Sequence, residues 1–585
     1  MSEPIVIANC SGFFGDRLAA AREQVEGGHI DVLSGDWLAE LTMLILARSK
    51  MKNPEAGWAR TFLTQLEDVL GTCLDRGIKI VSNAGGLNPA GCADAVRALA
   101  EQLGLSPRVA HVEGDDVLSR IDEFRAAGVE LRNADTGEPL DGVHPITANA
   151  YIGGWGIADA LERGADVVVT GRSTDAALVV GPAAWRFGWK RDDWDRLAGA
   201  VVAGHVIECG AQATGGNYAF FEEVPGIEHV GFPIAEVSED GSSVITKHAG
   251  TGGLVSVGTV TAQLVYEVAS PRYHNPDVTA RFDTIELAQD GADRVRISGV
   301  KGEPPPPTTK VGVNTLGGFR NSFTFVLTGL DIDKKAAVAE ATLWASIPGG
   351  KDAFREVDVQ LLRTDHDDPR TNEQALAYLK VTVIDSDPQK VGRKAFGNAA
   401  IEMALATYPG FFGTSLPDEG SPYGVYMPVL IPNELVSQTV VIDGERHDVE
   451  PVAIPETFDE PPAPQRVRNF DHDGSTVRAP LGRVAGARSG DKGGNANLGV
   501  WTRDATAFEW LSGFLTVGKF KELITEARDL NVERFDMPNI CALNFVVHGL
   551  LGKGVAASNR IDPQAKGLGE YLRARIVDLP ESLLR

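Results

Sequence analysis

Cysteine is scarce in this 585-residue chain, and its five cysteines are spread over the whole length without a C-x-x-C pair. An odd number at such spacing favours neither a disulfide framework nor a structural zinc site. The 11 histidines are equally dispersed, and none forms an H-x-H, H-x-x-x-H or H-E-x-x-H pattern. We therefore expect no metal site from the spacing of these residues.

Positive charge is also in short supply. Lysine and arginine total 55 against 80 aspartates and glutamates, which gives a formal net charge of −25 at pH 7. A field of this sign repels nucleic acids and anionic membranes unless a local basic patch reverses it. No run of Lys and Arg is long enough to do so. The composition argues against a nucleic acid or a membrane as partner.

Long apolar runs are missing as well. No uninterrupted segment approaches the roughly 18 apolar residues that a membrane span requires. The first residues, MSEPIVIANC, hold an acid at position 3 and no basic region ahead of an apolar run, unlike a signal peptide. We expect a soluble protein located in the cytoplasm.

Apolar residues nevertheless make up 43% of the chain, enough for a large buried core. The first 200 residues alternate short runs rich in Val and Ile with longer stretches of helical apolar spacing. The expected strands cover residues 4–10, 29–37, 78–86, 108–117 and 165–172, and the expected helices cover 38–49, 61–77, 93–104 and 151–164. This alternation predicts an α/β fold with a mostly parallel sheet and helices on both faces.

The pattern changes near residue 200. Residues 201–450 contain more Gly, Thr and Val and shorter strand patterns, which predicts an α+β region. Residues 451–479 are rich in Pro and Asp and lack an apolar period, which predicts an interdomain linker. Residues 480–585 combine strand and helix patterns in a small α+β domain. Together with the α/β region at 1–200, these are the expected parts of the chain.

Four expected strands of the first region end in small, polar, Gly-rich turns. Because the carboxyl ends of parallel strands meet at one sheet edge, a ligand bound there would contact all of these turns. Glycine lets the backbone approach a ligand, and free N–H groups at a helix start attract anions. Tight turns also need glycine for steric reasons alone. The candidate substrate-binding residues here are Gly15, Asp16, Asp36, Asn83, Gly85, Gly86, Asn88, Arg172, Ser173 and Asp175.

Arg172 is the strongest cationic anchor among them, because it follows an apolar strand and precedes a helix start. A local surface ion pair is the alternative role. None of the turns has G-x-G-x-x-G or G-x-x-x-x-G-K-[ST] spacing, so dinucleotide binding and nucleotide hydrolysis lack their main signals. We expect no required cofactor apart from any group that the substrate itself carries.

A second polar cluster lies in HVIECGAQATGGNYAFF, residues 205–221. Glu208 is a candidate catalytic acid or base, with a salt bridge or a helix cap as its alternative role. Gln212 and Asn217 are candidate substrate-binding residues. Cys209 is a possible nucleophile, although a free cysteine in an apolar context is more often inert.

A third polar group precedes the glycines of AGTGG. Lys247 is a candidate for binding a carboxylate or phosphate of the substrate. His248 is a candidate catalytic residue, because histidine transfers protons near neutral pH. A core position with structural hydrogen bonds is the alternative for this single histidine, and the Lys precedes the glycines instead of following them as in a phosphate-binding loop.

The segment RSGDKGGNANLG, residues 488–499, holds four glycines and only one bulky apolar side chain. A turn of this composition after a strand predicts several N–H groups in a concave arrangement, suited to a carboxylate or a phosphate. A tight turn that docks two domains is the alternative. The candidate catalytic residues are Asp491 and Lys492, and the candidate substrate-binding residues are Arg488, Ser489 and Asn495.

Several long strings carry a family resemblance. ANCSGFFGDR, SNAGGLNPAG, NAYIGGWGIADALERGADVVVTGRSTDAAL, IECGAQATGGN and KHAGTGGLVSVGTVTAQLVYE, in this order, resemble the acyclic terpene utilisation AtuA family, a former domain of unknown function. The resemblance runs over roughly residues 4–450. The tail, about 480–583, resembles the small AtuA-like domain with a ferredoxin-type fold, and RSGDKGGNANLGV is its most recognisable segment.

The resemblance implies a catabolic enzyme or enzyme component of bacterial terpene or branched-acid degradation through CoA thioesters. The favoured function is a hydratase, dehydratase or C–C lyase acting on a branched or terpenoid acyl-CoA or related carboxylic acid, with CoA as part of the substrate. A non-catalytic CoA-ester-binding or scaffold component is the first alternative, and a thiol enzyme using Cys209 is the second. A homo-oligomer is expected for a large enzyme of this kind.

Overall fold

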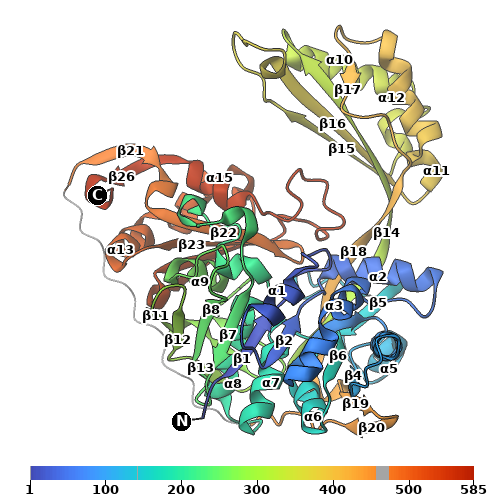
Figure 1. Ribbon diagram of the computed structural model, residues 1–585. Helices are drawn as coiled ribbons and strands as arrows, with labels where there is room; N and C mark the ends of the chain where they lie inside the picture. Colours follow the sequence, from blue (N-terminus) through green and yellow to red (C-terminus); the bar gives the residue numbers. More distant parts are fainter. Residues whose placement is uncertain (1, 141, 456–473, 585) are drawn as a thin grey trace. The chain divides into compact units, whose positions relative to one another are not determined.

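The structure, a computed structural model, describes residues 2–140, 142–455 and 474–584. The chain forms two compact units, whose elements are labelled in Figure 1. Unit 1 comprises residues 1–314, 426–555 and 562–585, and unit 2 comprises residues 315–425 and 556–561. Of the linker expected at 451–479, residues 456–473 lie outside the described residues.

In the described part of the chain, unit 1 is built on an eleven-stranded sheet with a parallel centre. The parallel strands, in spatial order, are β1 (Ile5–Asn9), β2 (Val32–Gly35), β3 (Lys79–Gly86), β6 (Val167–Gly171) and β4 (Val109–Glu113). The predicted α/β fold with a mostly parallel sheet in this region is confirmed.

Antiparallel strands extend this sheet on both sides, which the sequence pattern did not indicate. Beyond β1 lie β7 (Pro233–Val237), β8 (Ser243–Lys247), β12 (Val295–Ser298) and β11 (Glu286–Gln289). Beyond β4 lie β19 (Thr439–Ile442) and β20 (Glu445–Asp448). The flanking strands come from the predicted α+β region, so both regions share one sheet.

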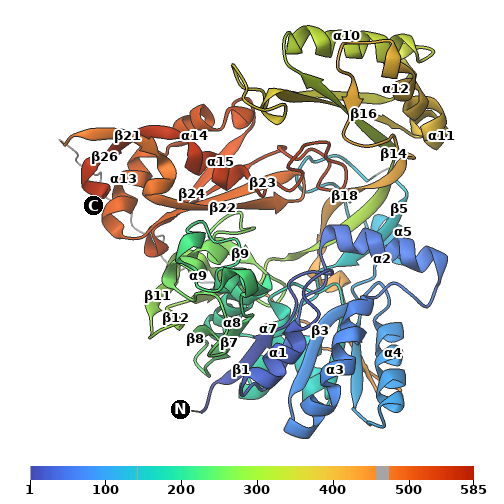
Figure 2. The same ribbon diagram turned by 45° about the horizontal axis from the view of Figure 1, so that its top comes forward.

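Helices cover both faces of the parallel strands (Figures 1 and 2). One core joins Ile7, Val32 and Val168 to the helices α6 (Trp155–Glu162), α7 (Ala177–Phe187) and α8 (Trp194–Ile207). The opposite core joins Ala8, Leu33 and Val169 to α1 (Ala20–Gly27), α3 (Arg60–Arg76) and α4 (Pro89–Gln102). Neighbouring residues of one strand thus enter opposite cores, which explains the near-continuous apolar runs.

Helix α8 is buried at every residue from Leu197 to Ile207. It packs closely on the start of α7, because a Cβ on Gly204 would lie 2.8 Å from the Cα of Ala176. Real Cβ atoms do not approach backbone so closely, so only glycine fits here. The carboxyl end of α8, which carries residues of the candidate site, is therefore held firmly against the sheet.

A C-terminal module of unit 1 contains an antiparallel four-stranded sheet in the described residues, in the order β22 (Ala485–Lys492), β23 (Asn495–Thr502), β25 (Ala542–Val547) and β24 (Val532–Met537). Its helices are α13 (Ala505–Phe514), α14 (Val517–Leu523) and α15 (Leu568–Ala574). The expected small α+β domain is confirmed. Helix α15 ends at Ala574, and strand β26 (Ile576–Pro580) follows it.

Two buried asparagines fasten this module to the rest of unit 1. The Asn544 amide nitrogen donates to the carbonyl oxygens of Val268 at 2.7 Å and Ala269 at 2.6 Å. The Asn497 side-chain oxygen accepts from the backbone N–H of Glu267 at 2.7 Å. Glu267 adopts φ +56°, an uncommon conformation for a residue other than glycine. The segment at 267–269 is thus held in one conformation by the module.

Unit 2 is an α+β unit, as expected for the middle region. Its sheet contains β15 (Glu356–Leu362), β16 (Leu376–Asp385), β14 (Thr308–Thr328) and β17 (Phe412–Gly413), all antiparallel. Helix α10 (Ile332–Ala345) packs on this sheet in a common core. The described residues contain no helix of the length and apolarity needed to cross a membrane.

Candidate functional site

Buried charged side chains gather at the carboxyl ends of the parallel strands. Arg172 directly follows β6 and is 4% exposed. Its Nη1 donates to the Leu38 carbonyl oxygen at 2.9 Å and lies 3.2 Å from Asp175 Oδ1. Its backbone N–H donates to Asp115 Oδ2 at 2.8 Å. Groups that follow β2, β4 and β6 thus fix the side chain and the backbone of Arg172, which defines the centre of what we call the strand-end cluster.

Asp36, at the end of β2, and Asn83, in β3, form a buried pair in this cluster. Asn83 Nδ2 donates to Asp36 Oδ1 at 2.6 Å, and Asn83 Oδ1 accepts from the Trp37 backbone N–H at 2.8 Å. Burial and the neighbouring Asp175 raise the pKa of Asp36 well above its ordinary value, although Arg172 opposes this. Because both ends of its amide are used, Asn83 orients Asp36 and has little capacity left for a ligand.

An aromatic wall, missed by the sequence analysis, stands beside Arg172. The Tyr151 ring lies 4.3 Å from the Arg172 guanidinium carbon and 4.5 Å from Lys310 Nζ. The Tyr151 hydroxyl lies 3.3 Å from both Glu40 Oε1 and the Tyr426 hydroxyl. Burial opposes ionisation of Glu40, yet the positive charges of Lys310 and Arg172 outweigh it and lower the pKa of Glu40 to about 2. Two cations thus face one aromatic ring and one carboxylate.

Glu208 and His205 lie one turn apart at the carboxyl end of α8. His205 Nε2 lies 3.0 Å from the Gln263 carbonyl oxygen, which can only accept, so Nε2 carries the proton in the neutral ring. His205 Nδ1 then faces Glu208 Oε1 at 3.4 Å. Among the described residues, the buried Glu208 Oε2 has no hydrogen-bond partner. One carboxyl oxygen is therefore buried and not engaged by a described protein group.

The electrostatic surroundings favour the neutral form of both members of this pair. Burial and the nearby Asp175 and Glu267 raise the pKa of Glu208 well above its ordinary value, against Lys492 and Arg172. Burial and the positive charge of Lys492 lower the pKa of His205 to about 4. A neutral imidazole thus lies beside a carboxyl group whose surroundings favour its protonated form, an arrangement suited to donating and recovering a proton.

Lys492 and Asp491, at the end of β22, bring the C-terminal module into the same site. Lys492 Nζ donates to the Glu267 carbonyl oxygen at 2.7 Å, and burial together with Lys310 lowers its pKa. Burial and Glu267 raise the pKa of Asp491 to about 7. Lys566 Nζ lies 3.9 Å from Asp491 Oδ1 and contacts the Tyr266 hydroxyl. The module thus places two lysines and one aspartate, Lys492, Lys566 and Asp491, close to Glu267 in the interior of unit 1.

The glycine-rich segment at 488–499 does not form the expected concave turn. Residues from Arg488 to Lys492 continue β22 and pair with β23, so only Gly493 and Gly494 form the turn, with φ +62° at Gly493. Most of its N–H groups are therefore used in a β-hairpin and are not free for an anion. A Cβ on Gly490 would lie 2.6 Å from the Tyr266 ring, so this glycine makes room for that aromatic side chain.

Cys209 is poorly suited to nucleophilic chemistry. Burial, Glu208 and Glu267 raise the pKa of its thiol well above the ordinary value, although Lys566 and Arg488 oppose this. The thiolate is the nucleophile in cysteine enzymes, and this environment disfavours it. The geometry therefore offers no support for the alternative of a thiol enzyme.

Other predicted residues of the module stabilise its packing. Arg488 Nη1 donates to the Asn217 carbonyl oxygen at 3.2 Å. Ser489 Oγ donates to the Lys566 carbonyl oxygen at 3.2 Å and accepts from a backbone N–H of α15. Asn495 Nδ2 donates to Asp135 Oδ1 at 3.0 Å. These contacts are those of residues that hold the hairpin in place.

Several predicted residues of the Gly-rich turns have local structural partners. Asp16 accepts from the backbone N–H groups of Gly12 and Arg17, and Asn88 caps α4 by accepting from Gly91. Gly15 lies beside the Phe13 ring, Gly85 beside the Thr170 carbonyl oxygen, and Gly86 has φ +51°. Ser173 Oγ and Gln212 Oε1 are buried without a hydrogen-bond partner among the described residues. Steric and capping needs thus account for most of these turns.

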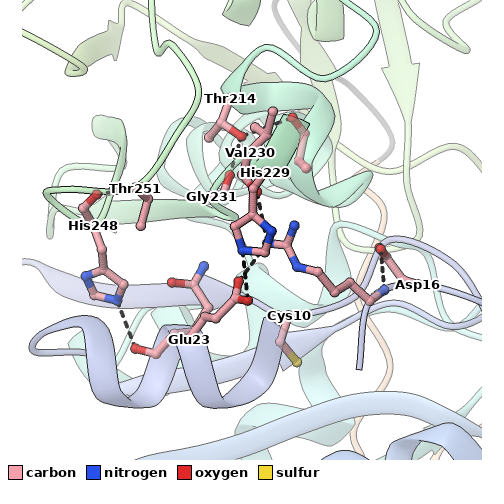
Figure 3. A network of polar contacts seen from close by, with 12 residues as sticks. Cys10, Asp16, Glu23, Thr214, His229, Val230, Gly231, His248 and Thr251 are labelled. Carbon is pink, nitrogen blue, oxygen red and sulfur yellow. Dashed lines mark hydrogen bonds and ion pairs between the residues drawn. The ribbon is translucent and has the colours of Figure 1, made fainter. Parts of the chain in front are cut away.

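Lys247 and His248 do not join the strand-end cluster in the described contacts. His248 Nε2 lies 2.8 Å from the Gln24 carbonyl oxygen of α1, and its ring points toward that helix in Figure 3. Burial lowers its pKa. Lys247 Nζ lies 3.1 Å from Asp293 Oδ2 and donates to the Thr251 carbonyl oxygen. The geometry corresponds to the core position that the sequence analysis left open for His248.

The missed site residues gave weak signals or none. His205 precedes Glu208 by three positions in a helical segment, so spacing alone could have paired them. Lys310 follows a proline-rich connector, Tyr426 lies in a mainly apolar segment, and Lys566 precedes Gly567 and Gly569. No group of three or more His, Cys, Asp or Glu side chains in the described residues is arranged to hold a metal ion.

Comparison with known proteins yields two family matches. The model of the acyclic terpene utilisation family protein AtuA matches residues 5–442, and the model of the AtuA ferredoxin-like domain matches residues 479–578. The first match covers well over half of the chain. No curated protein and no solved structure matches this chain.

Proposed function

The chain belongs to the acyclic terpene utilisation AtuA family, and we propose that it is a catabolic enzyme for a branched or terpenoid acyl-CoA or a related carboxylic acid. The proposed reaction is the addition or removal of water, or cleavage of a C–C bond, by general acid/base chemistry. The observation that carries the proposal is the buried pair of Glu208 and His205, with Oε1 and Nδ1 3.4 Å apart. Its surroundings favour the neutral form of both side chains. CoA belongs to the substrate, and no further cofactor is required.

Hydration of an α,β-unsaturated thioester illustrates the proposed roles. Neutral Glu208 gives its proton to the α-carbon while water forms a bond to the β-carbon. The electron pair of the C=C bond forms the new C–H bond. The proton lost by the water returns to the other oxygen of Glu208, whose Oε2 is free of partners in the described residues. His205 orients the carboxyl group, and the negative charge that develops on the thioester oxygen is stabilised by Lys492.

Arg172 and Lys310 supply the charge that an anionic or strongly polarised substrate group needs. Both cations contact the Tyr151 ring, from 4.3 and 4.5 Å. Their positions are set by backbone and carboxyl contacts before any ligand arrives, which avoids reorganisation during reaction. A non-catalytic CoA-ester-binding component would use the same cations without the acid/base pair, so the acid/base pair favours an enzyme.

Glu208→Gln tests this proposal directly. Because the surroundings of Glu208 favour its neutral form, an amide of the same shape should preserve the fold while removing the acidic proton. We expect kcat/KM to fall by about 100-fold or more on whichever branched acyl-CoA is turned over. The matched control is Glu223→Gln, because Glu223 is 46% exposed and pairs with Arg503 at the surface.

A substrate must first be identified. A thermal-shift screen with CoA and with short and branched acyl-CoAs identifies the ligands that raise Tm, and these are then assayed for turnover. Stabilisation by acyl-CoAs together with turnover supports the enzyme. Stabilisation without turnover of any of them would favour the binding component. An unchanged kcat/KM in Glu208→Gln removes Glu208 from the reaction. Light scattering of the purified protein tests the accompanying proposal of a homo-oligomer.

A further inference from the structure

A cavity of unit 1 adjoins the strand-end cluster without belonging to it. Its volume is about 410 Å³, within the usual range for small-molecule sites. Tyr151 lines this cleft, and the same ring contacts Arg172 and Lys310. The segment from Tyr151 to Trp155 thus forms a wall shared by the cleft and the cluster.

The walls of the cleft are mainly apolar. Ile152, Trp155, Pro276, Val436, Val449 and Val452 contribute to them. The ionisable groups that line the cleft are acidic, and none of the described lining residues is Lys or Arg. Asp277 is buried and accepts from the Gly154 backbone N–H at 2.7 Å, whereas Glu434 and Glu450 are exposed. Arg191, whose guanidinium carbon lies 4.4 Å from the Trp155 ring, offsets part of this negative charge. Because the three acids outnumber it, an anionic ligand group is disfavoured here by charge, and an apolar chain is favoured by burial.

Two buried polar atoms of lining residues have no hydrogen-bond partner among the described residues. Trp155 is 8% exposed, and its indole Nε1 donor is unpaired. Asn433 donates through Nδ2 to the Pro306 carbonyl oxygen at 2.6 Å, which leaves its Oδ1 acceptor unpaired. Both atoms belong to residues of the cleft wall, although neither has accessible surface. Small rotations of these side chains toward the cleft would let them bind a neutral group that can both accept and donate, such as a hydroxyl.

We propose that this cleft binds the uncharged, largely aliphatic part of an organic ligand that bears a hydroxyl group, while excluding carboxylates. Assigning the occupant to the substrate rests on the proposed function. The charged or polarised end of that substrate then contacts Arg172 and Lys310 on the other side of Tyr151. Because the cleft is acidic and the strand-end cluster presents the cations Arg172 and Lys310, the substrate can bind in one direction only.

Displacement of the neutral fluorescent probe N-phenyl-1-naphthylamine tests the cleft without any turnover. The competitors are 1-octanol and octanoate, which share a chain and differ in charge. We expect 1-octanol to displace the probe at a concentration at least about tenfold lower than octanoate at pH 8. Equal potency of the two competitors, or no probe binding, overturns the proposal.

Val436→Trp fills the cleft and should abolish displaceable probe binding. The matched control is Val477→Trp, because Val477 is 39% exposed in β21 (Thr476–Pro480) and does not line the cleft. The double variant Glu434→Gln/Glu450→Gln removes the exposed acids and should reduce the preference for 1-octanol by about two- to fivefold. Unchanged probe binding in Val436→Trp, or an unchanged preference in the double variant, contradicts the assignment.

These outcomes separate the cleft from the proposed function. Probe binding that is lost in Val436→Trp, in a protein that turns over no acyl-CoA, supports the cleft and contradicts the enzyme. Turnover that persists with the same KM and kcat in a correctly folded Val436→Trp supports the enzyme and contradicts the cleft as the place of the substrate chain. A raised KM in Val436→Trp with no change in Val477→Trp supports both.

Discussion

Replacing Arg172 by Met removes a buried charge and keeps much of the side-chain volume. Arg172 is 4% exposed, and its Nη1 contacts the Leu38 carbonyl oxygen at 2.9 Å and Asp175 at 3.2 Å. Breaking a buried ion pair by removing one partner typically costs about 3–5 kcal/mol, because the other charge stays buried. We expect the free energy of unfolding of unit 1 to fall by that amount at pH 7.

The size of this loss should depend on pH through Glu40. Burial opposes ionisation, yet Lys310 and Arg172 hold the pKa of Glu40 at about 2, below its ordinary value of 4.5. A lowered carboxyl pKa adds stability above the ordinary pKa, and this stability is lost as pH falls toward the folded-state pKa. Arg172→Met lacks the part of this stability that Arg172 provides. The difference in the free energy of unfolding between the variant and the wild type should therefore shrink as pH falls from about 5 to about 3.

Native-state hydrogen exchange of the β2 and β6 amides, in urea at pH 7 and pH 4, measures this effect in unit 1 separately from unit 2. The matched control is Arg108→Met, because Arg108 is 48% exposed and pairs with Asp443. A surface pair of this kind contributes at most about 1 kcal/mol. A loss in Arg172→Met no larger than in Arg108→Met, or equal at both pH values, would refute the reasoning.

Two further predictions concern the C-terminal module. Burial and Glu267 raise the pKa of Asp491 to about 7 from 3.8. Folding stability is therefore lost as pH rises between these two values. Asp491→Asn should raise Tm at pH 8 and leave Tm unchanged at pH 4. A lower Tm at pH 8 would contradict this. Asn544→Ala removes the donor to the Ala269 carbonyl oxygen and leaves the Val268 carbonyl oxygen with Asn497 Nδ2 alone. It should lower stability by about 2 kcal/mol in urea unfolding. The exposed Asn531→Ala is its control, and equal stability of the two variants would exclude the fastening role of Asn544.

Part of the site followed from strand geometry alone. Arg172 and Asp36 were found because polar residues directly after parallel strands share one edge of the sheet. Glu208 was found as an acid among small polar residues, yet its neutrality depends on burial and on Asp175 and Glu267, which sequence spacing does not show. Lys492 lies in the cluster, but on a hairpin strand and not on a concave turn. The residue types thus indicated which side chains belong to the site, but the sequence did not predict their geometry.

The residues that escaped sequence reasoning come from distant segments. Tyr151, Lys310 and Tyr426 lie more than 100 residues apart from one another, yet their side chains are in contact. Tyr151 stands beside Gly153 and Gly154, but no local pattern indicates that Lys310 or Tyr426 meets it. His248 shows the reverse case, since its Gly-rich neighbours indicated a site and its ring instead bonds to the backbone of α1.

The sequence by itself determined the alternation of strands and helices, the parallel centre of the large sheet and the separate C-terminal module. These follow from apolar period, chain direction and turn chemistry, which act over a few residues. Only the tertiary structure decided which charges meet in the buried interior and which of them stay ionised. That outcome depends on desolvation and on charges brought close by packing between segments hundreds of residues apart, and no local pattern encodes it.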